Sequence, residues 1–527
     1  MKRRNTLAAS AAVALATLSL AAAPKAILSS WDLNCARPDQ ILANADKFDR
    51  LAIDGVSIAL RETCEPSEEL TGYQRVSCGR SWSRDDLRKF VPTLRGIAAH
   101  KSMKESLLTF FFMPTRRLAW TDDAAWRSWN ENMASVAWLA REGGLKGLLL
   151  DTEDYWRSYQ FDLRPSDGLS FDAAAALARR RGAEMFKLVF AEHPEIAILT
   201  YWWLSRHYGY TGAQDPKAAV RGAGDLLVPF TDGLLDVMPP TVRFVDGNEH
   251  TYHWVFTRNY ADNHISNLDA VAPENRRKYR ACMGAGAALY LDMYANPKGS
   301  NWYRPPIGGR RLNAFLDRYE DATLAADDYV WLWGEKHSCI DWEGIRPSKR
   351  YEVAYTNGTW DAALPGFNEE FAILRNPRGE LIPRLRALKR SGKAVNLAGE
   401  VKSTGKFSRT VDVKGVRYGE WYAVLVETKG RQLSANCGLK IGDDPIWTRP
   451  TASVVFGEPA ADGTCRGIAF QRVWGDADGL YVNVECRPWD RGRELDDVKV
   501  SVYRVFAPGG DGEGYLRSVV TQGKGAE

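Results

Sequence analysis

Two carboxylates follow a short apolar run in the first half of the chain. Residues 147–150 read Gly-Leu-Leu-Leu, and Asp151 and Glu153 come directly after them. Such a run suits a strand that is buried on both faces of a parallel sheet, and barrel enzymes carry their chemistry at the carboxyl ends of such strands. On an extended strand both carboxyls point to the same side, so their mutual charge would raise the pKa of one of them toward neutrality. We expect Glu153 to act as a general acid with Asp151 beside it.

Further acids lie near the ends of other apolar runs. Glu335 follows Trp331-Leu332-Trp333, and Asp292 lies in the apolar run 285–294. Cleavage of a glycosidic bond needs a protonated acid and a second carboxylate. We expect Glu335 to be the catalytic partner of Glu153, with Asp292 as its rival. The alternative for each is an acid that caps a helix or pairs with an arginine.

Large aromatic side chains recur beside these acids. The chain has 19 Trp and 21 Tyr, and flat rings beside carboxylates suit sugars, whose C–H faces stack while their hydroxyls need polar partners. A single Trp in such a place serves a barrel core equally well. The residues expected to contact a substrate are Trp31, Asp32, Glu62, Trp202, Trp203, Arg206, His207, Glu249, His250, Tyr294 and Trp333.

One loop also has the composition of a metal site. Glu249, His250 and His253 lie within five residues, but only His264 offers a further anchor and there is no His-Glu-x-x-His motif. We therefore expect no metal and no cofactor, and we expect these side chains to bond sugar hydroxyls or one another. The Gly-x-Ser-x-Gly elbow of esterases is not visible in the sequence, which disfavours that class.

The spacing of apolar runs predicts the fold that positions these residues. Strand-like runs alternate with helical stretches such as 126–141 and 173–192, which predicts parallel strands joined by crossovers. The expected strands span 26–30, 51–60, 106–113, 147–150, 196–203, 233–238, 285–294 and 329–333. Eight such units predict an α/β fold, a (β/α)8 TIM barrel over residues 24–375. A doubly wound open sheet is the alternative, but no Gly-rich turn follows the first strand.

The remainder of the chain has a different texture. Residues 376–400 form a basic, partly helical linker, and residues 401–508 show short alternating runs that predict an all-β sandwich, a possible carbohydrate-binding module. Residues 509–527 are rich in Gly and charge and predict a disordered tail. The chain has eight Cys at wide spacing, and one disulfide among Cys437, Cys465 and Cys486 is plausible.

Charge and the first residues indicate where the protein works. Lys and Arg number 70 against 66 Asp and Glu, which disfavours a nucleic-acid partner. Residues 1–23 combine a basic start, an apolar stretch and three Ala, which predicts a secretory signal peptide. No later stretch reaches the ~20 apolar residues that a membrane span needs. We expect an exported protein, periplasmic or extracellular, without an integral membrane segment.

The segment 147–153 resembles the fourth-strand signature of chitinase-like barrel glycosidases, in which an Asp-x-Glu ends the strand. That resemblance implies Glu153 as the acid and Asp151 as the residue that orients a substrate acetamido group. The segment 235–238 is similar to the sixth strand of that superfamily. The chain departs from the pattern at Lys146 and at the Pro pair 239–240, which puts cleavage assisted by an N-acetyl group in doubt.

Two further resemblances are short. The Leu-Asp-Thr of the fourth strand, with acids after it, is similar to polygalactosaminidase-like barrels, and residues 496–503 resemble the last strand of jelly-roll carbohydrate-binding modules. Together these patterns indicate a secreted glycoside hydrolase that acts on a poly- or oligosaccharide. A non-catalytic carbohydrate-binding barrel, or a polysaccharide lyase that uses the His-bearing loop, stays as the alternative.

Overall fold

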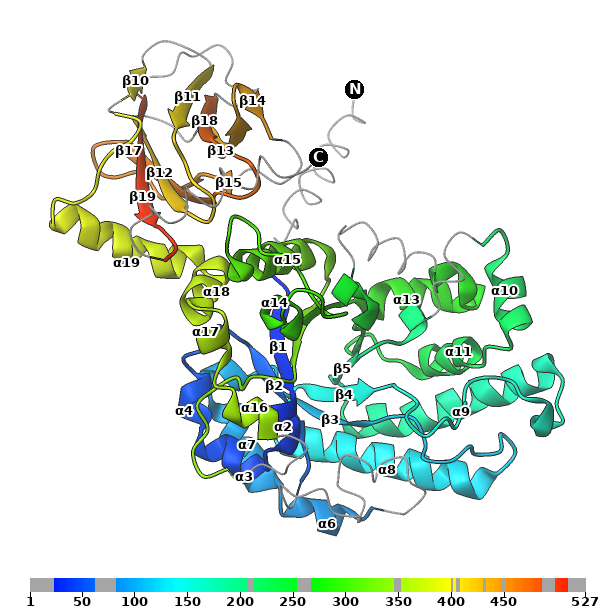
Figure 1. Ribbon diagram of the computed structural model, residues 1–527. Coiled ribbons are helices and arrows are strands. Elements are labelled where there is room, and N and C mark those ends of the chain that lie inside the picture. Colours follow the sequence, from blue (N-terminus) through cyan, green and yellow to red (C-terminus); the bar gives the residue numbers. More distant parts are fainter. Residues whose placement is uncertain are drawn as a thin grey trace, which may run out of the picture. The chain divides into compact units, whose positions relative to one another are not determined.

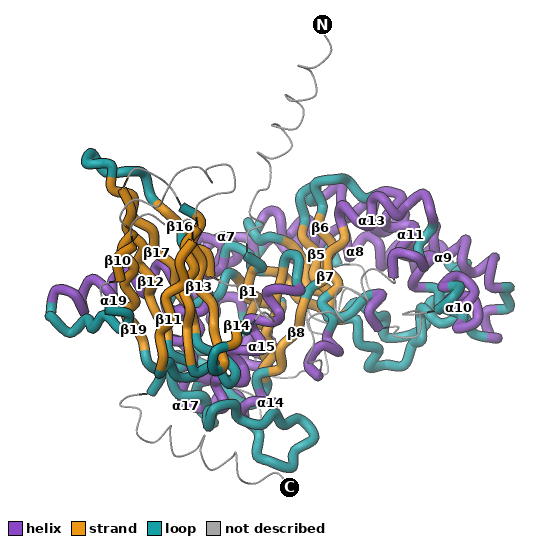
Figure 2. The backbone as a smooth tube through the Cα atoms, turned by 90° about the horizontal axis from the view of Figure 1, so that it is seen from above, coloured by secondary structure: helices purple, strands orange, loops and turns teal. Residues whose placement is uncertain are grey.

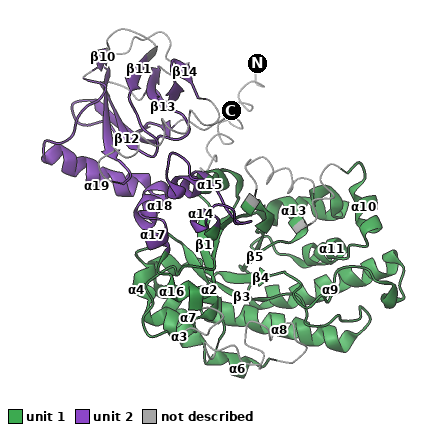
Figure 3. Ribbon diagram, viewed as in Figure 1, with its two compact units in different colours: residues 1–292, 318–359 green, residues 293–317, 360–527 purple. Residues whose placement is uncertain are grey.

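The chain folds into two compact units. The computed structural model describes residues 23–61, 82–206, 213–253, 267–345, 352–399, 401–403, 408–429, 433–446, 452–485 and 498–509. One unit comprises Met1–Asp292 and Arg318–Thr359, and the other Met293–Asp317 and Trp360–Glu527 (Figure 3). The predicted signal peptide, apart from its last residue, and the predicted disordered tail, apart from residue 509, lie outside the described residues.

The first unit is built on a parallel barrel (Figure 1). Its strands are β1 (Lys25–Ser30), β2 (Gly55–Ala59), β3 (Leu107–Phe111), β4 (Gly147–Asp151), β5 (Ala197–Thr200), β6 (Arg243–Asp246), β7 (Met283–Ala285), β8 (Ala287–Tyr290) and β9 (Tyr329–Gly334). They run in the order β7-β6-β5-β4-β3-β2-β1-β9-β8, and neighbouring strands in this order are parallel. Only Gly286 separates β7 from β8, so the two form one interrupted stave. β7 pairs with β6 and β8 with β9, which nearly closes an eight-stave barrel and confirms the predicted TIM fold.

Helices connect the staves. They are α2 (Trp31–Cys35), α3 (Pro38–Ala43), α4 (Ala45–Phe48), α6 (Arg84–Arg88), α7 (Val91–Ala99), α8 (Asp123–Glu142), α9 (Phe171–Glu192), α10 (Pro216–Ala223), α11 (Leu227–Val237), α13 (Arg276–Cys282), α14 (Asp292–Ala295), α15 (Arg311–Ala325) and α16 (Glu352–Thr356). Single turns of 3₁₀ helix are η1 (Lys101–Met103), η2 (Pro165–Asp167), η3 (Leu204–Arg206), η5 (Glu249–His253) and η6 (Pro273–Asn275). The predicted helices 126–141 and 173–192 are confirmed as α8 and α9. Side-chain caps fix both starts, because Asp122 accepts from two backbone N–H groups of α8 and Ser170 from one of α9.

The predicted sixth strand, 233–238, is wrong. Those residues belong almost wholly to α11, and the sixth stave is β6, directly after the Pro pair 239–240. A short apolar run does not distinguish a strand from a buried helix. Packing decides the case, because a Cβ on Gly233 would lie 1.8 Å from the carbonyl oxygen of Arg179 on α9. The similarity of 235–238 to a sixth barrel strand is therefore wrong as well, and the predicted seventh strand, 285–294, also ends early, at Tyr290.

The second unit contains the predicted all-β sandwich (Figure 2). One sheet runs β10-β19-β12-β17-β16 and the other β11-β18-β13-β14, with β15 paired to β13, and the paired strands are antiparallel. The strands are β10 (Val401–Ser403), β11 (Ser408–Lys414), β12 (Trp421–Lys429), β13 (Ser434–Ile441), β14 (Asp444–Pro445), β15 (Ala452–Ser453), β16 (Val455–Phe456), β17 (Thr464–Arg472), β18 (Gly479–Glu485) and β19 (Val498–Phe506). Val424, Leu480 and Val502 lie in the core of the sandwich. The alternating apolar residues of the strands predicted this architecture.

Helices and two free thiols complete the second unit. Its helices are α17 (Trp360–Ala363), α18 (Phe367–Arg375) and α19 (Pro377–Arg390). Leu381 and Leu385 of α19 pack with Trp421 in a second apolar cluster. Cys437 and Cys465 are buried and free, so they form no disulfide with each other, and Cys486 lies outside the described residues. Within the described part of the chain, no helix combines the length and apolarity needed to cross a membrane.

Candidate active site

Glu153 lies just past the carboxyl end of β4. The first residue of the strand, Gly147, has to be Gly because a Cβ there would lie 1.9 Å from the carbonyl oxygen of Ala197 on β5. Asp151 ends the strand, and its Oδ1 accepts the backbone N–H of Glu153 at 3.0 Å. Asp151 thus fixes the backbone that presents Glu153. Glu153 is partly buried, and the Tyr155 phenol donates a hydrogen bond to its Oε2.

The environment of Glu153 favours its protonated form. Burial, followed by the charge of Glu335, raises the pKa of Glu153 to about 7. We predicted that the charge of Asp151 would have this effect. The principal causes are instead loss of hydration and a carboxylate from another strand.

Glu335 follows β9 and is held by two neutral donors. Its Oε1 accepts the indole N–H of Trp333 at 3.1 Å, and its Oε2 accepts the phenol of Tyr290 at 3.1 Å. Tyr290 ends β8, so residues from adjacent staves fix one carboxylate. The arrangement suits a group that must stay in place as a nucleophile or a base.

Asp292 supports Glu335. It lies at the start of α14, two residues past β8, and is fully buried. Its carboxylate accepts the backbone N–H groups of Glu335 at 2.7 Å and of Lys336 at 3.1 Å. Burial raises the pKa of Asp292 to about 6, although the two N–H groups favour its charged form. These contacts are those of a positioning residue.

Glu249 is a further acid of the same site. Its backbone N–H donates to the Tyr201 carbonyl oxygen at 3.0 Å, which ties the loop after β6 to β5. Its Oε2 is shielded from solvent and has no hydrogen-bond partner among the described residues. Burial, followed by the charges of Glu153, Asp151 and Glu335, raises the pKa of Glu249 well above its ordinary value. We predicted Glu249 as a substrate contact, and the structure brings it close to the predicted catalytic carboxyls.

Stacked rings flank the carboxyls. Tyr201 stacks on Trp331 with ring centroids 4.6 Å apart and planes at 7°, and Trp202 stacks on the His250 ring at 5.1 Å and 8°. Trp333 meets Tyr201 edge-on at 6.0 Å. We predicted Trp202, His250 and Trp333 as substrate contacts but not Tyr201. Its place at the end of the fifth apolar run was the signal that could have indicated it.

A small pocket opens beside this aromatic frame. It measures about 10 Å³ and is lined by Phe112, Met113, Thr152, Phe161, Trp202, Trp203 and Leu227. A cavity needs about 10–15 Å³ to hold one water molecule. This hollow therefore has room for at most one water molecule and not for a sugar ring.

Four predicted contacts have structural partners instead. The Asp32 carboxylate accepts the backbone N–H of Cys339 and the indole N–H of Trp342, each at 2.8 Å, and Asp32 is fully buried. Trp203 is 1% exposed and donates to Thr231 Oγ1, so it belongs to the core. Trp31 is half-buried against Cys35. Tyr294 is buried against Phe315 in the second unit. We no longer expect Asp32 or Trp203 to touch a substrate, because their side chains are enclosed.

Other predicted residues stay predictions. Glu62 and His207 lie outside the described residues, as do the side chains of Arg206 and His253. Within the described residues, one group has the geometry to hold a metal, formed by Asp46, Asp49 and His100. Its members precede β2 and β3, at the barrel end opposite Glu153, and His100 Nδ1 already bonds Asp49 at 2.9 Å. The loop of Glu249 and His250 contributes nothing to that group.

Comparisons with known proteins give distant structural similarities only. No family model and no curated protein matches the chain. Among solved structures, it is similar to endo-glycoceramidase II from Rhodococcus sp. at 9% identity, with 88% of this chain and 97% of that chain covered and a TM-score of 0.34. It is also similar to a Thermobaculum terrenum O-GlcNAc hydrolase at 10% identity, with 59% of this chain and 54% of that chain covered and a TM-score of 0.32, so the chain spans about half of that protein. A sugar phosphate isomerase/epimerase from Parabacteroides distasonis is similar at 11% identity, with 64% of this chain and 96% of that chain covered and a TM-score of 0.29.

Proposed function

We propose that the barrel is a glycoside hydrolase that cleaves a poly- or oligosaccharide. The observation that supports this proposal is the pairing of two carboxyls from different staves whose environments differ. Burial and the charge of Glu335 favour a proton on Glu153, whereas Trp333 and Tyr290 donate to Glu335. A carboxyl that holds a proton, together with a second carboxyl fixed in position, is what cleavage of a glycosidic bond requires.

The proposed reaction assigns each carboxyl a role. Glu153 transfers its proton to the glycosidic oxygen as the bond from that oxygen to the anomeric carbon breaks. The carboxylate of Glu335 either attacks the anomeric carbon or takes a proton from a water that attacks it. If Glu335 attacks, a water then breaks the ester bond between Glu335 and the anomeric carbon and gives a proton back to Glu153. If Glu335 acts as a base, the proton that it took from water is released to solvent and Glu153 takes up a proton from solvent. In both routes one water is consumed and one hydroxyl forms on each fragment. Asp292 holds the backbone of Glu335 in place during these steps.

The proposal extends to the rest of the chain. The leader-like residues 1–23 support export, and the partly exposed stacked rings of Trp202 and His250 support a sugar ligand over a flexible charged one. We propose a secreted enzyme that needs no cofactor. The sandwich of the second unit is the candidate carbohydrate-binding module.

The test compares the purified protein with Glu153→Gln and with a matched control, Glu343→Gln. Glu343 is an exposed glutamate that pairs with Lys47, so its loss should leave the site unchanged. Each protein is incubated with plant, algal and bacterial polysaccharides, and released oligosaccharides are weighed by mass spectrometry. Products that gain one water with wild type and Glu343→Gln, but not with Glu153→Gln, support the proposal. Equal release by Glu153→Gln excludes Glu153 as the acid, and unsaturated products would indicate a lyase.

A further inference from the structure

Two tyrosines on the loop after β4 expose their rings. Tyr155 is 56% exposed and Tyr159 is 42% exposed. A single exposed ring needs no explanation, but two within five residues, directly after Glu153, form a local concentration of aromatic surface. Neither ring was among the predicted site residues.

The backbone of this loop is held in an unfavourable conformation. Arg157 and Tyr159 have φ angles of 54° and 49°, the left-handed region that side chains other than Gly rarely adopt. The Asp154 carboxylate stabilises the turn by accepting the backbone N–H groups of Ser158 at 2.9 Å and of Tyr159 at 2.6 Å. Such strain persists only where the surroundings impose it, and it concentrates at functional sites.

The neighbouring loop, between β3 and α8, braces the loop from outside. Arg117 donates to the carbonyl oxygens of Tyr159 and, at 2.8 Å, of Asp162, and it forms an ion pair with Asp167 at 2.7 Å. The Gln160 side chain bonds both backbone groups of Leu118, at 2.7 and 3.1 Å. The exposed rings therefore sit on a backbone fixed at several points.

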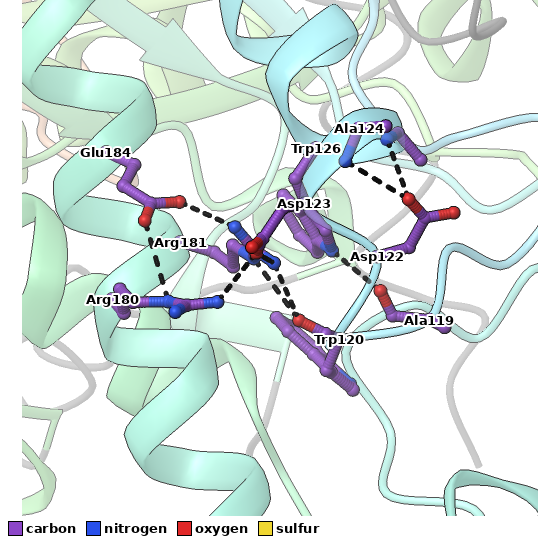
Figure 4. A network of polar contacts seen from close by, with 10 residues as sticks. Ala119, Trp120, Asp122, Asp123, Ala124, Trp126, Arg180, Arg181 and Glu184 are labelled. Atoms are coloured by element: carbon purple, nitrogen blue, oxygen red, sulfur yellow. Dashed lines mark hydrogen bonds and ion pairs between the residues drawn. The ribbon is translucent and has the colours of Figure 1, made fainter.

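The brace is itself anchored to α9, as Figure 4 shows. Arg181, which is 2% exposed, donates twice to the Trp120 carbonyl oxygen, at 3.2 and 3.0 Å. The same guanidinium pairs with Asp123 and, at 2.8 Å, with Glu184. A buried arginine with this many partners fixes the chain at Trp120, three residues after Arg117.

The rings are also packed among one another and near a cation. Tyr155 meets Phe111 at 5.2 Å, and Trp156 meets the same ring at 5.1 Å, both in T-shaped contacts. The Arg164 guanidinium lies over the Tyr159 ring at 4.1 Å. The phenol of Tyr155 donates to Glu153. The aromatic cluster is thus continuous with the proposed catalytic acid.

We propose that Tyr155 and Tyr159 form a rigid aromatic platform on which sugar rings of the substrate stack next to Glu153. This inference rests on the proposed function and specifies its substrate class as a chain of several pyranose units. Rings fixed before binding lose little entropy when a sugar stacks on them. A substrate too short to reach the platform forfeits that contact, so the enzyme should prefer longer chains.

Binding is tested in the Glu153→Gln background, where no hydrolysis interferes. Tyr155→Ala, Tyr159→Ala, Tyr155→Phe and a control, Leu188→Ala, are run by affinity electrophoresis in gels that contain xylan, laminarin, pectic galactan or chitosan. Leu188 is a 41% exposed apolar residue of α9. We expect each alanine variant to bind the retained glycan about tenfold more weakly. Tyr155→Phe and Leu188→Ala should bind like their parent, and thermal unfolding verifies that every variant is folded.

The outcomes separate this inference from the proposed function. If wild type hydrolyses a glycan and the alanine variants bind it as well as their parent, the platform is wrong and the hydrolase stands. If nothing is hydrolysed but glycan retention depends on the two tyrosines, the platform stands and the hydrolase is wrong. Loss of binding in Tyr155→Phe would show that the phenol hydroxyl, and not the face of the ring, makes the contact and would overturn stacking. Neither hydrolysis nor retention with any glycan refutes both.

Discussion

Replacing Glu153 with Gln should change how the stability of the barrel depends on pH. The pKa of Glu153 is about 7 in the folded protein, against an ordinary value of 4.5. The difference of about 2.5, at 1.36 kcal/mol for each pKa unit, corresponds to about 3 kcal/mol. Between pH 4.5 and 7 the folded state binds this proton more tightly than the unfolded state does. The free energy of unfolding therefore falls as pH rises through that window and levels off above it.

Gln cannot ionise, so Glu153→Gln lacks this loss. The stability advantage of the variant over wild type should grow by about 2–3 kcal/mol from pH 4.5 to pH 8, since the titration of Glu249 is coupled to that of Glu153 and reduces the full value. Only the change with pH matters, because loss of the bond from Tyr155 adds a nearly constant offset.

Urea unfolding at a series of pH values measures this effect. Hydrogen exchange followed by mass spectrometry on peptides of β4 and α9 reports on the barrel unit separately from the sandwich unit. The control Glu343→Gln should show no such growing advantage over wild type. A Glu153→Gln advantage that stays constant within about 0.5 kcal/mol from pH 4.5 to 8 would refute the assignment of a shielded, proton-holding Glu153.

Three further predictions concern other parts of the two units. Asp292→Asn keeps the shape of the side chain but removes one carboxylate oxygen that accepts from the backbone at Glu335. The kcat should therefore fall about 10- to 100-fold, with KM within about twofold of wild type. An unchanged kcat would show that Asp292 does not position Glu335. Gly247→Ala places a Cβ 2.0 Å from a carbonyl oxygen of β5, so the free energy of unfolding of the barrel, measured in urea, should fall by about 2–4 kcal/mol. Asp317→Ala removes the 2.6 Å partner of the buried Arg472 guanidinium, and calorimetry should show the second unit less stable by about 3 kcal/mol, whereas an unmoved transition would mean that other contacts suffice.

The barrel was predictable from the sequence because its strongest patterns are local. Four largely apolar strands, β1, β3, β4 and β9, and two long amphipathic helices, α8 and α9, all appear at their predicted places. The alternating pattern of the C-terminal strands was equally direct. These features depend on residues within a few positions of one another, which is the range over which periodicity carries information.

The sixth stave was missed because its assignment depends on distant contacts. Residues 233–238 are as apolar as a strand, and only the close approach of α9 to Gly233 makes them a helix. The four-residue strand β6 follows that helix, and its sequence, Arg-Phe-Val-Asp, has only two apolar residues and gives little signal. The predicted strand was wrong because the contact between α9 and Gly233 cannot be read from the composition of residues 233–238.

The sequence alone determined which residue types stand at the strand ends, and hence that Glu153, Glu335 and Asp292 were candidate catalytic residues. Tertiary structure decided what each carboxyl experiences. It enclosed Asp32 among donors from the chain around Cys339, gave Asp292 the backbone of Glu335 to hold, and left one oxygen of Glu249 shielded and without a hydrogen-bond partner among the described residues. Hydration, repulsion and donor geometry depend on groups that lie up to about three hundred residues apart in the chain and only a few ångströms apart in space. No local pattern records those distances, so the type of a residue is read from sequence and its protonation state from the fold.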